Sequence, residues 1–246
     1  MGEERVALVT GASRGIGRAA GLALARAGSP VAFGYRSDPV NAEEAAAKVA
    51  AEGGRAMAVP IDVADEASVA AAFDRVEAGL GPVRVLVNNA GFSRDGLAVK
   101  YPTGAWDDTM DVNLRGAFLC SRRALAGMLR ARWGRIVSVA SVAALRGNAG
   151  QIAYSASKSG LLGLTRSLAR EVGGRGITAN AVCPGYVETA MTEATRQDNV
   201  RRYLDVTPAG RAGTPEEIAA VIAFLASPEA SYVNGAVVPV DGGMTA

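Results

Sequence analysis

The chain has 246 residues, of which 49% are hydrophobic, and its formal net charge is +2. This length fits one α/β domain, and so balanced a charge gives no reason to expect binding to nucleic acid or to an acidic membrane surface. Because the sequence contains no histidine, it excludes Ser-His-Asp and Cys-His catalysis and most zinc sites, and we predict no metal.

Short β-branched runs alternate with Ala- and Leu-rich stretches of helical length along the whole chain. This alternation predicts one α/β domain over residues 1–246, with a doubly wound, seven-stranded parallel sheet and helices on both faces. The stretch 186–211 has no strand signal and is predicted to act as a mobile substrate lid. The predicted strands are 5–10, 30–35, 55–63, 83–91, 134–141, 177–185 and 236–243, and the main predicted helices are 41–52, 66–79, 106–130 and 154–172.

A glycine-rich loop, "LVTGASRGIGRAA" at residues 8–20, follows the first predicted strand. Glycines at 11, 15 and 17 let backbone N–H groups approach a phosphate, with the positive end of a helix dipole behind them. The alternative is a strand-to-helix turn that only needs flexible residues. In an open parallel sheet, ligands bind at the carboxyl ends of the strands. Gly11, residues 88–91, Ser141 and residues 184–185 fall at such ends, so we expect them to converge on one crevice.

The first residues are charged and then strand-like, which is unlike a secretory signal. No apolar run approaches the ~18 residues that a membrane span needs. We therefore expect a cytoplasmic protein. Cys120 and Cys183 form no CxxC pair, so we expect both to be reduced and structural.

Tyr154 and Lys158 are spaced i, i+4 near the start of a predicted helix, so their side chains share one face. Lowering the pKa of a phenol from about 10 to about 7 requires roughly 4 kcal/mol. An ammonium about 6 Å away contributes on the order of 3 kcal/mol at an effective dielectric constant of 20. Such a pair alone is usually just two helix residues. Ser141, at the end of a predicted strand, favours catalysis because its hydroxyl can hold a substrate carbonyl beside the phenol.

Six motifs occur in order along the chain: "TGASRGIG" at 10–17, "NNAG" at 88–91, Asn113 in "MDVNLRGAF", Ser141, "YSASK" at 154–158 and "PGYVET" at 184–189. Their order and spacing resemble the short-chain dehydrogenase/reductase family. The resemblance implies a Rossmann-type fold and a catalytic tetrad. In the family the tyrosine is the acid/base, the serine steadies the carbonyl, the lysine binds the nicotinamide ribose and lowers the tyrosine pKa, and the asparagine anchors a proton relay. The implied tetrad here is Asn113, Ser141, Tyr154 and Lys158. Without the other three, Asn113 would be read as a polar helix residue capping a neighbour.

The same resemblance implies a dinucleotide site. The glycine loop becomes the pyrophosphate turn, Asp62 and Val63 flank the adenine, Asn88 and Ala90 line the cleft, and Thr189 lies near the carboxamide. The implied cofactor-binding residues are Gly11, Ser13, Arg14, Gly15, Ile16, Gly17, Arg36, Asp62, Val63, Asn89, Ala90, Gly91, Tyr154, Lys158, Pro184, Gly185, Val187 and Thr189.

Charge at the second strand indicates which cofactor is preferred. A site for NAD needs a carboxylate at the end of this strand, whereas the 2′-phosphate of NADP needs arginine. The strand is followed by Arg36, and Arg14 lies in the glycine loop, so we predict NADP(H). Asp38 is the contrary observation, but it precedes Pro39 as an N-cap precedes a proline in the first turn of a helix, and we interpret it as structural.

Four further stretches are similar to the 3-oxoacyl-(acyl-carrier-protein) reductases of this family: "SRDGL" after "NNAG", "SLAREVGGRGITANAVCPGYVETAMT", "TPAGRAGTPEEIAAVIAFLAS" and "VDGGM". This likeness implies NADPH-dependent reduction of a 3-oxoacyl thioester in fatty-acid-type synthesis. It also implies docking of an acidic acyl-carrier protein at Arg132 and Arg175, and a homotetramer built on helices 106–130 and 154–172. Between Val99 and Ala105 the sequence differs from the pattern of the subgroup. This segment therefore does not support the expectation that the substrate is linked to an acyl-carrier protein.

Alternatives remain for each of these expectations. The chain can instead be a sugar or secondary-alcohol dehydrogenase of the same family, which a carboxylate at position 35 or 36 would have supported. It can also be a noncatalytic dinucleotide-binding sensor or scaffold, although such relatives typically lose Tyr or Lys from the tetrad. Arg132 and Arg175 can be solvated surface residues.

Overall fold

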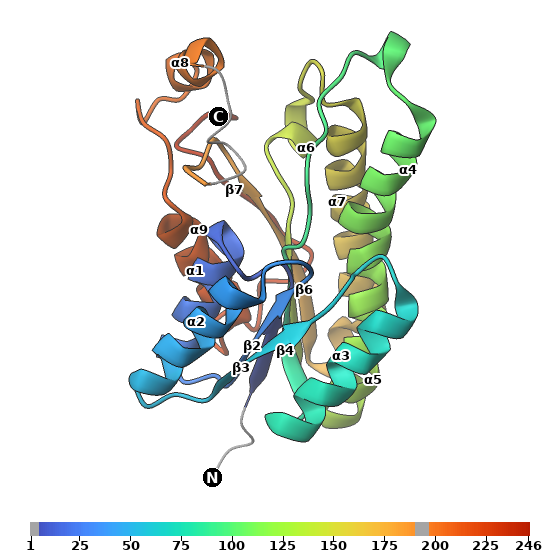
Figure 1. The fold of residues 1–246 in the computed structure, drawn as a ribbon, viewed down its shortest axis with the longest axis vertical. Helices are drawn as coiled ribbons and strands as arrows, with labels where there is room; N and C mark the ends of the chain where they lie inside the picture. The colour runs from blue at the N-terminus through green and yellow to red at the C-terminus, as the bar shows by residue number, and fades with distance from the viewer. Residues whose placement is uncertain (1–4, 190–196) are drawn as a thin grey trace.

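The computed structural model describes residues 5–189 and 197–246, and a parallel sheet forms its centre (Figure 1). The seven strands are ordered β3-β2-β1-β4-β5-β6-β7, and every neighbouring pair is parallel. The order reverses beside β1, where Val9 pairs with Phe33 of β2 on one side and with Val87 of β4 on the other. This doubly wound Rossmann-type arrangement confirms the predicted fold. The strands are β1 (Val6–Val9), β2 (Val31–Tyr35), β3 (Ala56–Pro60), β4 (Val83–Asn88), β5 (Gly134–Val139), β6 (Ile177–Pro184) and β7 (Val237–Val240).

Helices cover both faces of the sheet, as predicted (Figure 1). Alanines of α1 (Gly15–Arg26) and α2 (Pro39–Ala51), with isoleucines of α9 (Pro215–Ala226), bury the face that carries Phe33 and Val137. The other face, which carries Leu8 and Ile136, is covered mainly by α3 (Glu66–Gly79), α5 (Gly116–Ala131) and α7 (Ile152–Val172). The shorter helices are α4 (Thr103–Met110), α6 (Ala143–Arg146), α8 (Gln197–Asp205) and the 3₁₀ turns η1 (Ala98–Lys100) and η3 (Gly173–Arg175).

The predicted helix 106–130 is longer and less regular than expected. Pro102 precedes the first turn, where a missing N–H costs nothing, and α4 begins at Thr103. A π-helical segment, η2 (Asp111–Arg115), then separates α4 from α5. Such segments occur frequently at functional sites. The predicted strands 55–63 and 83–91 end early, at Pro60 and Asn88, because the chain leaves the sheet there to form the rim of the crevice.

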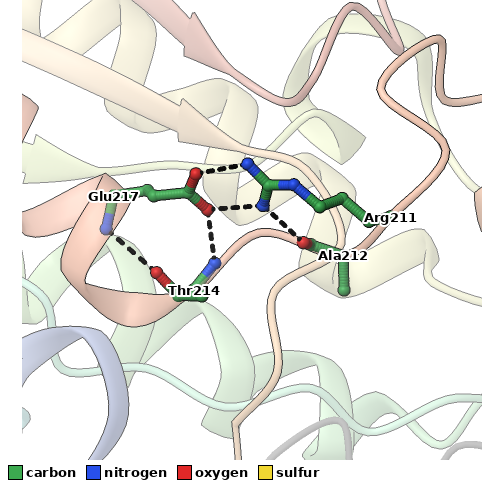
Figure 2. A network of polar contacts seen from close by, with 4 residues as sticks. All are labelled: Arg211, Ala212, Thr214 and Glu217. Atoms are coloured by element: carbon green, nitrogen blue, oxygen red, sulfur yellow. Dashed lines mark hydrogen bonds and ion pairs between the residues drawn. The ribbon is translucent and has the colours of Figure 1, made fainter.

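A capping box fixes the start of α9 (Figure 2). Thr214 Oγ1 accepts from the Glu217 N–H at 3.3 Å, and Glu217 Oε2 accepts from the Thr214 N–H at 2.8 Å. The Arg211 guanidinium donates to both Glu217 oxygens at 2.9 and 2.6 Å, and it holds the pKa of that carboxyl down to about 2. The capping box therefore marks where the predicted lid segment ends.

The predicted lid 186–211 lies partly outside the described residues, since 190–196 are not described. Val187 forms a bridge with Gly213, so the two ends of the segment are held together. Its described part contains α8. Mobility of the segment stays a prediction.

No helix within the described ranges is both long and apolar enough to cross a membrane. Residues 5–189 and 197–246 also contain no group of three or more Cys, Asp or Glu side chains that could hold a metal ion. Cys120 and Cys183 are free thiols, both buried.

Candidate active site

A cavity of about 480 Å³ lies at the carboxyl ends of the strands, beside the point where the strand order reverses. The residues predicted to bind the cofactor lie at or near these ends, and all of them except Gly17 line the cavity. Those residues are Gly11, Ser13, Arg14, Gly15, Ile16, Arg36, Asp62, Val63, Asn89, Ala90, Gly91, Tyr154, Lys158, Pro184, Gly185, Val187 and Thr189.

The glycine loop is a close-packed cradle at one end of this cavity. Gly11 has φ +62°, and a Cβ there would lie 2.9 Å from the Ala90 Cα, so only glycine fits. Gly17 supports the loop from behind, because a Cβ at this position would lie 2.5 Å from the Gly11 carbonyl oxygen. Asn89 Nδ2 donates to the Thr10 and Gly11 carbonyls, both at 2.9 Å. The loop therefore presents the N-terminus of α1 to the cavity, which suits an anionic phosphate.

Asn88 does not line the cleft, contrary to the expectation from the family motif. Successive side chains of a strand point to opposite faces of the sheet. Asn88 is therefore buried toward α5, where its Nδ2 donates to Ser121 Oγ at 3.0 Å. Its neighbour Asn89 is the asparagine that reaches the cavity.

Arg14 and Arg36 line the end of the cavity near β2. Within residues 5–189 and 197–246 neither guanidinium forms an ion pair. Asp38 lies beside them, but its carboxylate accepts from the Asn41 backbone N–H at 3.3 Å and from Asn41 Nδ2 at 2.9 Å. Pro39 follows as the first residue of α2, which confirms that Asp38 is the N-cap of that helix. Among the described residues, these two positive charges at this end of the cavity thus have no carboxylate partner.

Ser141, Tyr154 and Lys158 meet at the other end of the cavity. Ser141 follows β5, and its hydroxyl accepts from the Ala143 N–H at 3.1 Å and lies near enough to Tyr154 to favour its phenolate form. Tyr154 and Lys158 project from the start of α7, with the ammonium 5.7 Å from the centre of the phenol ring. Lys158 Nζ donates to the Val139 carbonyl at 2.7 Å. The two hydroxyls can therefore hold one carbonyl oxygen between them, beside a fixed positive charge.

The pKa of Tyr154 is raised by the surroundings that the protein itself provides. Burial is the largest cause, the charges of Asp95, Tyr203 and Cys183 act in the same direction, and only Ser141 favours the phenolate. Burial also lowers the pKa of Lys158 to about 8. The protein's own groups therefore keep the proton on Tyr154, because desolvation of the phenol outweighs the effect of Ser141. The lowering expected from Lys158 together with the bound cofactor stays a prediction.

Asn113 lies in the π-helical segment, behind the cavity wall rather than in it. Its Oδ1 accepts from the Phe92 N–H, and its Nδ2 donates to the Phe92 carbonyl, each at 3.0 Å. The same Nδ2 donates to Ser157 Oγ at 3.1 Å. Asn113 thus ties the loop after β4 to α7. Gly91 packs closely in front of it, since a Cβ at this position would lie 3.0 Å from Asn113 Oδ1.

Sequence reasoning missed several lining residues: Ser37, Asp38, Ile61, Phe92, Ser93, Val112, Val139 and Ala140. Most of them lie within a few residues of a predicted strand end. Their nearness to these ends could have identified them as lining residues.

Arg132 and Arg175 lie together, but far from this cavity. Arg132 has φ +52° at the end of α5 and precedes β5, while Arg175 precedes β6. The Arg132 guanidinium donates to the Gly174 carbonyl at 3.4 Å. Both arginines therefore lie at the amino ends of strands whose carboxyl ends carry Ser141 and Pro184. At about 3.3 Å per residue, the six-residue strand β5 alone separates them from the site by about 20 Å.

A family model described as "Enoyl-(Acyl carrier protein) reductase" matches residues 11–245 of the chain. A 3-oxoacyl-(acyl-carrier-protein) reductase of Pseudomonas aeruginosa is 47% identical over 240 residues, covering 98% of this chain and 97% of the relative. The chain belongs to the short-chain dehydrogenase/reductase family. The corresponding reductase of Escherichia coli is 43% identical over 242 residues, and the match covers 98% of this chain and 98% of the relative.

Solved structures of the same family superpose closely. One, described as a gluconate dehydrogenase from Agrobacterium tumefaciens, has a TM-score of 0.94 at 36% identity and covers 98% of this chain and 95% of its own. Another is a blue fluorescent protein from a metagenomic library in complex with NADPH, with a TM-score of 0.93, 42% identity and 98% coverage of both chains. The chain is therefore a short-chain dehydrogenase/reductase oxidoreductase, of a family that uses NAD(P)H.

Proposed function

We propose that this chain reduces a 3-oxoacyl thioester to the 3-hydroxyacyl thioester with NADPH, in fatty-acid-type synthesis in the cytoplasm. The observation that carries this proposal is that Ser141, Tyr154 and Lys158 lie together at one end of a cavity whose other end carries Arg14 and Arg36. The relatives named as 3-oxoacyl-(acyl-carrier-protein) reductases support the choice of substrate.

The cavity residues fit NADP(H). The cradle at Gly11 and the N-terminus of α1 suit the pyrophosphate, and the guanidiniums of Arg14 and Arg36 suit the 2′-phosphate. When bound, NADPH supplies the hydride that adds to C3 of the substrate.

The chain's own residues do the remaining chemistry. Ser141 and Tyr154 hold the C3 carbonyl oxygen by their hydroxyls, and Tyr154 gives its proton to this oxygen as it gains negative charge. Lys158 stabilises the phenolate that remains and binds the ribose beside it. Asn113 holds the Phe92 loop and Ser157 in place, which positions α7 and anchors the proton relay that restores Tyr154.

Isotope transfer tests this reaction. Acetoacetyl-CoA and NADPH deuterated at the reactive carbon of the nicotinamide should give 3-hydroxybutyryl-CoA with one deuterium at C3. A product without deuterium at C3, or no product, contradicts the proposal.

A second candidate is oxidation of a sugar acid or secondary alcohol at the same tetrad. The structural neighbour described as a gluconate dehydrogenase favours it. Arg14 and Arg36 suit the 2′-phosphate of NADP and therefore argue against an NAD-dependent form of this reaction. A noncatalytic sensor is disfavoured, because Tyr154 and Lys158 are both present and face the cavity.

We further propose that Arg132 and Arg175 dock an acidic acyl-carrier protein. Changing both to glutamate should raise the KM for a carrier-linked substrate several-fold, most at low salt, because exposed charge pairs are worth about 0 to 1 kcal/mol each and are screened over about 8 Å at physiological ionic strength. The KM for acetoacetyl-CoA should change little. Steady-state kinetics with both substrates at two salt concentrations measure this.

The matched control is Lys48→Glu with Arg75→Glu, the same change of charge at exposed positions on α2 and α3. Equal losses on both substrates, or the same loss in the control, contradict docking. The arginines lie at the amino ends of the strands, far from the active site of their own chain. A carrier protein docked there would therefore deliver its substrate to the active site of a neighbouring subunit.

We also propose a homotetramer built on α4, α5 and α7. Phe118 on α5 is 44% exposed, and Gly163 on α7 faces open space, so this side of the chain offers an apolar residue and room for close helix packing. Sedimentation at micromolar concentration should give a tetramer, and Phe118→Glu should yield smaller species. Val40→Glu, at a 63% exposed position on α2, should not. A wild-type monomer refutes the proposal.

A further inference from the structure

Tyr203 is fixed in place beside the turn that leads into α7, by contacts that the catalytic mechanism does not use. It lies on α8, half-buried, and its ring stacks on that of Tyr186 with centres 5.2 Å apart and planes 11° from parallel. Thr207 Oγ1 donates to the Tyr203 carbonyl at 2.7 Å. Tyr186 directly follows Gly185, which lines the cavity. The Tyr203 ring is therefore held against Tyr186, which lies between two lining residues, Gly185 and Val187.

A chain of hydrogen bonds with a fixed direction ends on the Tyr203 hydroxyl. It starts at Asp95, whose carboxylate only accepts: Ser93 Oγ donates to it at 2.6 Å and Gln151 Nε2 at 3.2 Å. This fixes the Gln151 amide, so its Oε1 faces Asn148 and accepts from Asn148 Nδ2 at 2.9 Å. The same Nδ2 donates to Tyr203 Oη at 2.9 Å.

Tyr203 Oη is therefore an acceptor in this chain, and its own proton remains available to donate. Across residues 5–189 and 197–246 this hydroxyl donates to no acceptor. This half-buried donor can therefore bind a ligand oxygen in place of water.

The hydroxyl lies near the reacting group. Asn148 and Gln151 belong to the turn that leads into α7 at Ile152, two residues before Tyr154. Ser93, at the start of the chain of hydrogen bonds, lines the cavity.

We infer that Tyr203 is a specificity-determining residue, whose hydroxyl donates a hydrogen bond to the thioester carbonyl of the substrate while Ser141 and Tyr154 hold the C3 carbonyl. The inference rests on the proposed function and deepens it. A 3-oxoacyl thioester carries a second carbonyl oxygen two carbons from the reacting one, and a simple ketone does not. A site that provides a donor for this oxygen discriminates against ketones that lack it.

The test compares two substrates that differ only at this oxygen, with Tyr203→Phe as the variant. One is the acetoacetyl thioester of N-acetylcysteamine, and the other is its thioether, in which a methylene replaces the thioester carbonyl. Tyr203→Phe keeps the stack on Tyr186 and removes the hydroxyl. It should lower kcat/KM about tenfold for the thioester and less than twofold for the thioether. The melting temperature and the Kd for NADPH should stay unchanged.

Tyr186→Phe is the matched control, because it also keeps the stack but leaves the chain from Asp95 to Tyr203 intact. Its ratio of kcat/KM for thioester over thioether should equal that of the wild type. Equal losses of Tyr203→Phe on both substrates, or no loss on the thioester, overturn the inference and leave the proposed function standing. A wild-type protein that does not reduce the thioester with NADPH overturns the proposed function itself.

Discussion

Tyr154→Phe is expected to lower kcat for reduction of a 3-oxoacyl thioester by about 10²- to 10⁴-fold, the usual contribution of general acid catalysis. Only the phenolic oxygen is removed, so the ring keeps its place at the start of α7 and against Lys158. Steady-state rates with NADPH and acetoacetyl-CoA measure the loss. The Kd for NADPH and the melting temperature should stay close to the wild-type values.

Tyr232→Phe serves as the control, because Tyr232 is fully exposed and lies outside the cavity lining. It should retain the wild-type kcat. If Tyr154→Phe kept more than about a tenth of that kcat, a different group would have to supply the proton. The pH profile adds an independent check. Burial raises the pKa of Tyr154, so the protonated donor persists through neutral pH, and reduction should slow only as pH rises through this raised value.

Arg36→Asp is expected to lower the preference for NADPH over NADH, measured as the ratio of their kcat/KM values, at least tenfold. A hydrogen bond to a charged group contributes about 1.5 to 3 kcal/mol, and about 1.4 kcal/mol corresponds to a factor of ten. The substitution also places a carboxylate where NAD-dependent enzymes bind the ribose hydroxyl. NADH turnover should therefore be kept or improved.

The matched control for this prediction is Arg26→Asp, the same change of charge at the far end of α1. It should leave the cofactor ratio unchanged. Equal kcat/KM of the wild-type protein for NADPH and NADH would show that Arg14 and Arg36 do not select the cofactor.

The fold and most of the cavity lining could be predicted from the sequence because both depend on local patterns. Alternating strands and helices give the parallel sheet, and residues just after a strand end must meet at one edge of it. The N-cap role of Asp38 was predictable for the same reason, since Pro39 follows it directly. The sequence also allowed the positions of Arg132 and Arg175 to be predicted. Each directly precedes or nearly precedes a strand, and such residues lie at the amino end of the sheet.

Other features depend on contacts between distant segments and could not be predicted. The π-helical turn around Asn113 follows from packing between the loop after β4 and α7. The raised pKa of Tyr154 depends on how far the folded chain buries it. The hydrogen bonds from Asp95 to Tyr203 join the loop after β4, the turn before α7 and helix α8, and no spacing rule reveals them.

A comparison of kcat/KM for three substrates tests the central claim most directly. The kcat/KM of the wild-type protein should be compared for a carrier-linked 3-oxoacyl thioester with NADPH, for the matching 2-enoyl thioester with NADPH, and for gluconate with NADP⁺. The account predicts that reduction of the 3-oxoacyl thioester exceeds the other two reactions by at least about tenfold, because only this substrate offers a carbonyl to Ser141 and Tyr154 and a second oxygen to Tyr203. A higher kcat/KM for gluconate or for the enoyl thioester would contradict it.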